Sequence, residues 1–356
     1  MSRKMIAVAA AGAMALAPVA PAFAATGLQD RVDRLTGADG FAGAVAQVDD
    51  RRTVKSGTAE LGTDRPMPGA DGRFRVASMS KPVVAVTVMR LAEQGKVRLG
   101  APVETYLPRA IRGKADGRKI KVRDLLRHTS GLADFTQAVD WSNPDQDYLK
   151  LALRLKPTPY GTFAYSNTNY LVLGMIIDSV AGDFRRASRD LVLKPLGMRH
   201  TYWPKPGEQG IRGQHAHMYG VHPAAPEAGV VDTTRMPGYL LGASGGLVST
   251  PKDLNRFWQG VFGGRLLSAK SLRAMTSAPV AVRQEGWPSQ ARYGHGMTRL
   301  RLACGTVWMH EGDLPGISVM SGRSATGRQA TVYVTGSATG KGRDHLRDAF
   351  ETAVCR

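Results

Sequence analysis

The feature that most constrains the fold of this chain is a serine and a lysine at the start of a long apolar helix. Ser78-Met79-Ser80-Lys81 runs directly into the apolar residues 82–91. Residues three apart lie one above the other on a helix face, so the Ser78 hydroxyl and the Lys81 amine can meet without help from distant parts of the chain. Apolar residues occur on nearly every side of this helix, which indicates that it is buried.

Burial of this helix start has a chemical consequence. Desolvation lowers the pKa of a lysine, and a neutral Lys81 can accept a proton from Ser78 and make it a nucleophile. The alternative is that Ser78 is only the N-cap of the helix, since Ser-x-x-Lys also occurs by chance. The motif alone leaves both interpretations open.

The first residues have the pattern of an export signal. Arg3 and Lys4 precede an apolar, Ala-rich stretch that ends at Ala22-Phe23-Ala24. This pattern predicts a Sec-type signal peptide over residues 1–24 and a secreted protein. A retained N-terminal anchor is the alternative, although the stretch is short for one. No other apolar run reaches the length of about 18 residues that a membrane span needs, so no span is expected after cleavage.

Charge and cysteines limit the partners. The formal net charge is +19, which favours anionic wall polymers or membrane surfaces, or a solvated basic surface without a specific partner. The basic residues are scattered and not interleaved with aromatics, so no nucleic-acid partner is expected.

In an exported chain the two cysteines, Cys304 and Cys355, predict one disulfide. It would tie the strand before Trp308 to the C-terminal helix.

Strand patterns lie at both ends of the chain and helix patterns lie between them. This arrangement predicts an α/β (α+β) fold, in which a mixed, mainly antiparallel sheet is flanked by helices. We expect a sheet domain from residues 25–100 and 240–356 and a large helical insertion domain from residues 101–239. Strands are expected at 42–48, 53–57, 293–301, 306–310, 317–321 and 330–335, a first helix at 28–35 and a closing helix at 346–354. Residues 206–238 are rich in Gly, Pro and His and are expected to be loop, and His128 is expected to be a structural turn residue.

Two later stretches carry suitable chemistry. Tyr165-Ser166-Asn167 lies in a polar loop, where the tyrosine can act as a phenolate or proton relay beside a lysine and the Asn167 amide can bind a peptide-like group. His310-Glu311-Gly312 follows a strand pattern. A strand edge beside a nucleophile can offer a backbone N–H to an oxyanion, and Gly312 would let a substrate approach closely.

In this order and at this wide spacing, the three boxes resemble the serine β-lactamase-related family. This family holds the penicillin-recognising DD-peptidases, class C β-lactamases and related esterases. Flanking runs at 122–132, 195–198 and 242–257 carry the same resemblance. Tyr-x-Asn and His-x-Gly, together with the cysteine pair, look most like the secreted actinobacterial D-alanyl-D-alanine carboxypeptidases. The resemblance implies the β-lactamase/DD-peptidase-like fold.

The resemblance also implies an acyl-enzyme mechanism. Ser78 would attack a carbonyl, Lys81 and Tyr165 would activate it and return the proton to the leaving group, and His310 would serve positioning and proton traffic. Asn167 would hold the substrate amide. No metal or other cofactor is required.

The backbone N–H groups of Ser78 and Asp313 would form the oxyanion hole. The implied partners are a small peptide, amide or ester, including a peptidoglycan stem peptide, and β-lactams as acylating ligands. The protein is expected to be a monomer.

One residue departs from the family pattern. Glu311 stands where the carboxypeptidases usually have a hydroxyl residue that helps hold the substrate carboxylate, and Asp313 follows closely. Two acids there would repel a carboxylate by roughly 1–4 kcal/mol. Arg299 and Arg301, on the preceding strand, would compensate if their side chains reached the pocket. A D-amino peptide, a D-aminoacyl amide or ester, and a small ester all stay open as substrates.

Three rival interpretations have weaker support in the sequence. Residues 242–246 match Gly-x-Ser-x-Gly, and Ser244, Asp253 and His310 follow the order of an α/β-hydrolase triad, but no helix begins directly after Ser244. A metal site at His215, His217 and His222 lacks acidic or cysteine partners at ligand spacing. A non-catalytic wall-binding protein would have no need of Ser78, Lys81 and Tyr165 together.

Overall fold

The computed structural model describes residues 27–143, 145–237 and 241–356 of the 356-residue chain. The predicted signal peptide over 1–24 and the predicted boundary between 239 and 240 fall outside these ranges. The helices within them are all too short or too polar to cross a membrane.

Eight strands of the described chain form one sheet in the spatial order β2-β1-β12-β11-β10-β9-β8-β7. Each neighbouring pair is antiparallel, which confirms the predicted fold class. The strands are β1 (Gly43–Val48), β2 (Arg52–Gly57), β7 (Val280–Ala281), β8 (Arg292–Tyr293), β9 (Thr298–Leu302), β10 (Gly305–Leu314), β11 (Ile317–Ser324) and β12 (Gln329–Val334).

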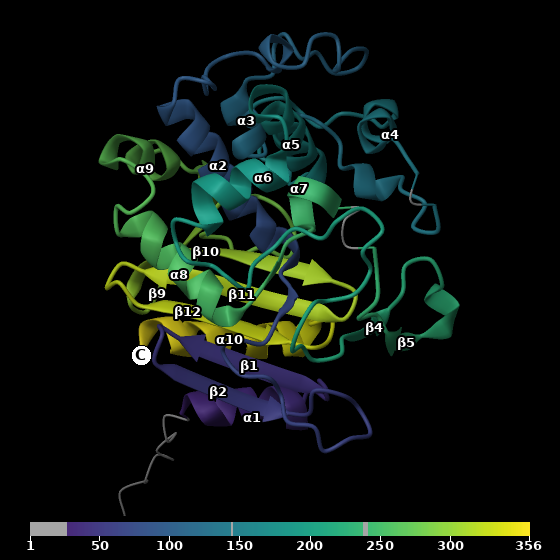
Figure 1. The fold of residues 1–356 in the computed structure, drawn as a ribbon, viewed down its shortest axis with the longest axis vertical. Coiled ribbons are helices and arrows are strands. Elements are labelled where there is room, and N and C mark those ends of the chain that lie inside the picture. Colours follow the sequence, from purple (N-terminus) through teal and green to yellow (C-terminus); the bar gives the residue numbers. More distant parts are fainter. Residues whose placement is uncertain (1–26, 144, 238–240) are drawn as a thin grey trace, which may run out of the picture.

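Helices cover both faces of this sheet (Figure 1). The helices α1 (Leu28–Gly37) and α10 (Gly340–Cys355) pack on one face, and α8 (Pro251–Phe262) packs on the other. Strand β12 shows why both layers are needed. Val332 and Val334 are buried with α1 and α10, whereas Tyr333 between them is buried in the cluster that contains α8. Side chains alternate across a strand, so this central strand is apolar on both faces.

The remaining helices gather above the sheet around α2 (Ser80–Glu93), whose side chains are almost all buried, as predicted (Figure 1). Helix α2 contacts α5, α6 and α7. The other helices are α3 (Val122–Leu126), α4 (Tyr148–Arg154), α5 (Asn167–Ala181), α6 (Phe184–Ser188), α7 (Gly242–Gly245) and α9 (Ala269–Thr276). Two short strand pairs lie outside the main sheet. Strand β3 (Phe74–Arg75) pairs with β6 (Val248–Ser249), and β4 (Tyr219–Val221) pairs with β5 (Val230–Asp232). The division into a sheet domain and a helical insertion stays a prediction.

Two expectations about local structure were wrong. The strand expected at 293–301 is split into β8 and β9, because the chain turns at Gly294 and Gly296. Gly296 has φ +83°, and a Cβ there would lie 2.3 Å from the Cβ of Ala85 in α2. The stretch 206–238, expected to be all loop, contains the short hairpin of β4 and β5.

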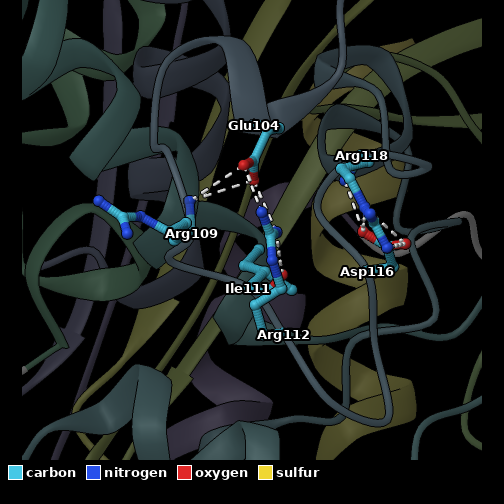
Figure 2. A network of polar contacts seen from close by, with 6 residues as sticks. All are labelled: Glu104, Arg109, Ile111, Arg112, Asp116 and Arg118. Atoms are coloured by element: carbon cyan, nitrogen blue, oxygen red, sulfur yellow. Dashed lines mark hydrogen bonds and ion pairs between the residues drawn. The ribbon is translucent and has the colours of Figure 1, made fainter.

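The connection from α2 to α3 is held by the polar network in Figure 2. Glu104 accepts hydrogen bonds from the backbone N–H of Arg109 and from the guanidinium of Arg112. Asp116 pairs with Arg118 at 2.9 Å. These contacts hold the long irregular segment between α2 and α3 in place. The chain after α3 carries residues that contact the candidate site described below.

The predicted disulfide is present. Cys304, in the turn between β9 and β10, is bonded to Cys355 at the end of α10, with a Cα–Cα distance of 5.2 Å. The bond therefore joins the sheet to its covering C-terminal helix.

Candidate active site

Ser78 stands in a tight turn that directly precedes α2. The turn is the 3₁₀ segment η1 (Ala77–Met79), and Ala77 has φ +50°, a left-handed conformation that residues other than glycine rarely adopt. The Ser80 hydroxyl supports the turn, because it donates to the Ala77 carbonyl at 2.7 Å and accepts from the Leu247 N–H at 3.0 Å. Ser78 itself is partly exposed, so its hydroxyl is accessible.

Lys81 is buried directly behind Ser78. Its Nζ lies 2.9 Å from Ser78 Oγ, 2.7 Å from Asn167 Oδ1 and 2.7 Å from the Ser244 carbonyl. Burial lowers the pKa of Lys81 to about 7, against a smaller opposing effect of the Asp134 charge. A neutral amine has two N–H groups and one lone pair. If the N–H groups bind the two carbonyl oxygens, the lone pair faces the Ser78 hydroxyl.

Tyr165 covers the lysine and hydrogen-bonds to Ser78. The Lys81 Nζ lies 4.9 Å from the centre of the Tyr165 ring. Burial raises the pKa of Tyr165 well above its usual value, and the hydrogen bond with Ser78 opposes that rise only in part. The phenol therefore stays protonated at neutral pH, which favours a proton relay over the phenolate that the sequence also allowed.

His128, interpreted from the sequence as a structural turn residue, supports Tyr165 from below. The two rings lie 4.4 Å apart, and His128 Nδ1 accepts a hydrogen bond from the Ser166 N–H at 3.2 Å. His128 is fully buried, and burial lowers its pKa well below the usual value. A neutral imidazole thus orients the loop that presents Tyr165.

Asn167, expected in a loop, is the first residue of α5. Its side-chain oxygen accepts from Lys81, so its Nδ2 group must point the other way, and it donates to Asp134 Oδ2 at 2.9 Å. The amide orientation is therefore fixed from both sides. One N–H of Nδ2 is left for a ligand, because Asp134 takes only one.

His310 is neutral and held at both ring nitrogens. Nδ1 lies against the carbonyl oxygen of Glu311, which can only accept, so Nδ1 carries the proton and Nε2 accepts from the Tyr293 hydroxyl at 2.9 Å. Burial, and next the Lys81 charge, lower the pKa of His310 to about 3. This geometry suits positioning and does not suit proton traffic at neutral pH.

The acids after His310 are paired with a residue that sequence reasoning missed. Arg343, on α10, donates from Nη1 to Glu311 Oε2 at 3.2 Å and from Nη2 to Asp313. The expected compensation by Arg299 and Arg301 is wrong. Both are exposed on β9, opposite Trp308 and Thr306, on the far side of His310. No sequence signal links Arg343 to Glu311 across 32 positions.

Gly312 has a structural reason that the sequence did not reveal. A Cβ at this position would lie 2.4 Å from the Val76 carbonyl oxygen and 3.2 Å from Ala77 Cβ. The glycine therefore lets β10 pass directly beneath the turn that carries Ser78. Strand β9 pairs with β10 only up to Met309, so the edge of β10 beyond that residue has no strand partner on this side in the described chain.

These groups meet in one pocket of about 640 Å³. The predicted residues Ser78, Tyr165, Asn167, His310, Glu311 and Asp313 all line it. Residues 285–287, before β8, and the start of α10 complete the walls. The structure thus brings together residues that are up to 235 positions apart, with Lys81 behind Ser78.

The rival sites do not assemble. Ser244 is fully buried and its hydroxyl donates to the Leu241 carbonyl at 2.6 Å, so it cannot meet a substrate. Its own carbonyl binds Lys81 instead. His217 contacts Asp232 at 2.6 Å, yet within 27–143, 145–237 and 241–356 no three His, Cys, Asp or Glu side chains gather as metal ligands do.

Comparison with known proteins agrees with this geometry. A family model described as Beta-lactamase matches residues 28–353. A D-stereospecific amidohydrolase from Streptomyces sp. is 30% identical, with a TM-score of 0.79 over 91% of this chain and 97% of that one. A D-amino acid amidase from Ochrobactrum anthropi SV3, solved with L-phenylalanine amide, is 27% identical, with a TM-score of 0.76 over 92% and 98%.

Curated relatives overlap only in part. Two Bacillus subtilis proteins named as penicillin-binding proteins match at 28% identity over 73% and 78% of this chain. The matches span 61% and 64% of their lengths. The D-alanyl-D-alanine-carboxypeptidase/endopeptidase AmpH of Escherichia coli K12 is also 28% identical, over 54% of this chain and 49% of its own.

Proposed function

The chain belongs to the β-lactamase family, and from that premise we propose that it is a serine hydrolase that cleaves amide bonds of D-amino-acid substrates through an acyl-enzyme on Ser78. The observation that carries the proposal is the Lys81 amine, 2.9 Å from Ser78 Oγ, with a pKa lowered by burial to about 7. A base poised near the working pH is what general-base activation of a serine requires.

Acylation follows from the contacts around Ser78. As Ser78 Oγ attacks the carbonyl carbon, its proton passes to neutral Lys81, directly or through the Tyr165 hydroxyl. The backbone N–H groups of Ser78 and Asp313 would bind the oxyanion. When the C–N bond breaks, Tyr165 or Lys81 returns the proton to the leaving nitrogen. The amine departs, and an ester to Ser78 remains.

Deacylation reverses these steps with water. Neutral Lys81 accepts a proton, directly or through the Tyr165 hydroxyl, from the water molecule that attacks the ester, and it returns this proton to Ser78 Oγ as the acid is released. His310 would hold its wall of the site and would not transfer a proton, because burial lowers its pKa to about 3. Asn167 would offer its remaining N–H to the substrate amide.

A D-amino-acid amide or short D-peptide is the substrate class that we favour. Similarity to two D-specific amide hydrolases over nearly their full lengths supports this choice. A D-alanyl-D-alanine carboxypeptidase is the second candidate, supported by similarity to AmpH. The ion pairs of Arg343 with Glu311 and Asp313 weigh against it, because they occupy a cation that a terminal carboxylate would need. Esters are a further class of substrate, since an ester is a more reactive acyl donor than an amide.

We further propose that the protein is secreted through the segment 1–24 and acts as a monomer. Peptidoglycan stem peptides are candidate natural substrates, and β-lactams are candidate acylating ligands of Ser78. The basic net charge of +19 would favour retention at an anionic wall.

The test is active-site labelling followed by a substrate panel. A fluorophosphonate probe should label Ser78, located by peptide mass spectrometry. The panel holds D-phenylalanine amide, a D-Ala-D-Ala peptide, a p-nitrophenyl ester and nitrocefin, and D-phenylalanine amide should be hydrolysed faster than its L-enantiomer. A folded protein that takes up neither this probe nor a fluorescent penicillin would support a non-catalytic wall-binding protein instead.

A further inference from the structure

The charge of the pocket is opposite to that of the chain. Four acids line it, Glu285, Glu311, Asp313 and Asp344, against two arginines, Arg343 and Arg347. The chain as a whole carries +19. A cleft lined by one sign of charge raises the local concentration of ligands of the other sign. The negative charge of the pocket is therefore a local property of the residues that line it.

Both arginines of the pocket already contact protein acceptors. Arg343 donates from Nε to the Ala338 carbonyl at 3.2 Å, from Nη1 to Glu311 and from Nη2 to Asp313. Arg347 donates to the Gly286 carbonyl at 2.9 Å and pairs with Asp344 at 3.5 Å. Each nitrogen of Arg343 thus has a protein acceptor with which a ligand carboxylate would have to compete, whereas Nε of Arg347 is buried without a hydrogen-bond partner.

The acids, by contrast, keep accepting capacity. Arg343 takes one oxygen of each acid, Oε2 of Glu311 and Oδ1 of Asp313, and the Ser318 hydroxyl also donates to that Oδ1 at 2.7 Å. A carboxylate has two oxygens, so each acid retains a second acceptor. The Asp313 side chain is 47% exposed, so its second oxygen is within reach of a ligand.

The acids line the same pocket as Ser78 and Tyr165. The leaving nitrogen takes its proton from the Tyr165 and Lys81 side of Ser78. The Tyr165 ring lies 6.4 Å from the His310 ring, and Glu311 follows His310 along β10. A leaving group that extends from Tyr165 past His310 thus reaches Glu311 and Asp313 along the unpaired edge of β10.

We propose that Glu311 and Asp313 select substrates whose leaving group carries a positive charge, and that they select against a leaving group with a carboxylate. This specificity rests on the acyl-transfer function proposed above. The ligand class is an amide or short peptide bond followed, within a few atoms, by a primary ammonium. Glu311 and Asp313 act here as specificity determinants through their free oxygens, while Arg343 holds them in place.

The test uses three amides of N-acetyl-D-phenylalanine that differ only in the leaving group. The leaving groups are ethylenediamine, glycinamide and glycine, which place an ammonium, a neutral amide or a carboxylate at the same distance from the scissile nitrogen. We expect kcat/KM to fall in that order, with about a tenfold or larger difference between the first and the last, the size that charges at short range produce. A glycine compound cleaved as fast as the ethylenediamine compound, or faster, overturns the proposal.

A matched pair of variants separates the pocket acids from overall charge. Glu311→Gln keeps the shape and one acceptor for Arg343, and should reduce the ethylenediamine-to-glycine ratio by several-fold. Glu227→Gln removes the same charge from an exposed residue outside the pocket and should leave that ratio unchanged. An unchanged ratio in Glu311→Gln, or an equal change in both variants, contradicts the assignment.

Protection of Ser78 gives a readout that needs no turnover. N-acetylethylenediamine should slow fluorophosphonate labelling at a lower concentration than N-acetylglycine does. Labelled Ser78 with the opposite order of protection overturns the charge selection alone, whereas a folded protein that takes no label overturns the acyl-transfer function itself.

Discussion

The two sides of the pocket are built in different ways. The nucleophile side is local: Ser78 and Lys81 are three residues apart, and their contact follows from helix geometry. The opposite wall is assembled over distance, because Glu311 on β10 and Asp313 are held by Arg343 on α10. We assign the proposed chemistry to the local side and the proposed specificity to the distant side, so the two could change separately.

The largest expected effect is on the local side. Ser78→Ala should lower turnover of D-phenylalanine amide by about four orders of magnitude or more, as loss of a serine nucleophile does elsewhere. The matched control is Ser244→Ala, which removes a hydroxyl bound only within its own turn and leaves the carbonyl that binds Lys81. Its activity should stay within a few-fold. The reverse outcome would restore the Gly-x-Ser-x-Gly interpretation.

The next effect concerns the attachment of the distant wall. Replacing Cys304 and Cys355 together by serine should lower the free energy of unfolding by about 4 kcal/mol in the chain-entropy model, measured by urea denaturation. Because the bond anchors α10, which carries Arg343, the selectivity between charged leaving groups should weaken while Ser78 still takes the fluorophosphonate. Loss of labelling in the folded variant would show that the two sides are not separable.

A smaller effect is expected from removing the cation of the wall. Arg343→Ala should destabilise the protein by about 1–3 kcal/mol at pH 8, because it leaves two charged acids unpaired. Burial raises the pKa of Glu311 and the Arg343 charge opposes that rise, so the variant leaves the cost of burying the charged carboxylate uncompensated. The unpaired charge of Glu311 destabilises the variant only above the folded-state pKa of that acid, where it is ionised. The loss of unfolding free energy should therefore shrink toward pH 4, as the acid is protonated.

Arg301→Ala is the control for that variant, since Arg301 is exposed on β9. Its effect should stay within about 0.5 kcal/mol at both pH values. An equal loss in the two variants would remove the assigned role of Arg343.

The smallest effect is a pH dependence that tests the local side again. With a Lys81 pKa of about 7, the neutral base is present above that pH, so kcat/KM should fall about tenfold for each pH unit on the acid limb. Since the pKa of His310 is about 3, His310→Asn should lower activity without moving the midpoint. A midpoint that disappears in this variant would assign the limb to His310.

The sequence predicted the parts of the fold that local patterns determine. The first helix, the hairpin of β1 and β2, and the buried α2 follow directly from apolar periodicity. The disulfide followed from the cysteine count in a chain with a predicted export signal. The three boxes could be proposed as catalytic because each contains its chemistry within three or four consecutive residues, and residues of all three line one pocket.

The misses concentrate at the distant wall. Strand β10 was expected to end at His310, since Glu311-Gly312-Asp313 has the composition of a turn, but pairing of Glu311 with Met320 and of Asp313 with Ser318 extends the strand. Tertiary pairing overrides local strand propensity in this way. Helix α10 was expected to start at 346 and starts at Gly340, so Arg343 lay outside every predicted element. Because of both errors, the ion pairs of Arg343 with Glu311 and Asp313 were not predicted.

The unpaired stretch of β10 also matters for solubility. A strand edge without a partner is a template for strands of other molecules and hence for aggregation. Charged side chains at such an edge oppose this pairing, and Asp313, about half exposed, stands where a second copy of β10 would have to align. The acids that we assign to specificity would therefore also keep the open catalytic edge from aggregating. Variants that neutralise both would combine a change of substrate with a risk of insolubility.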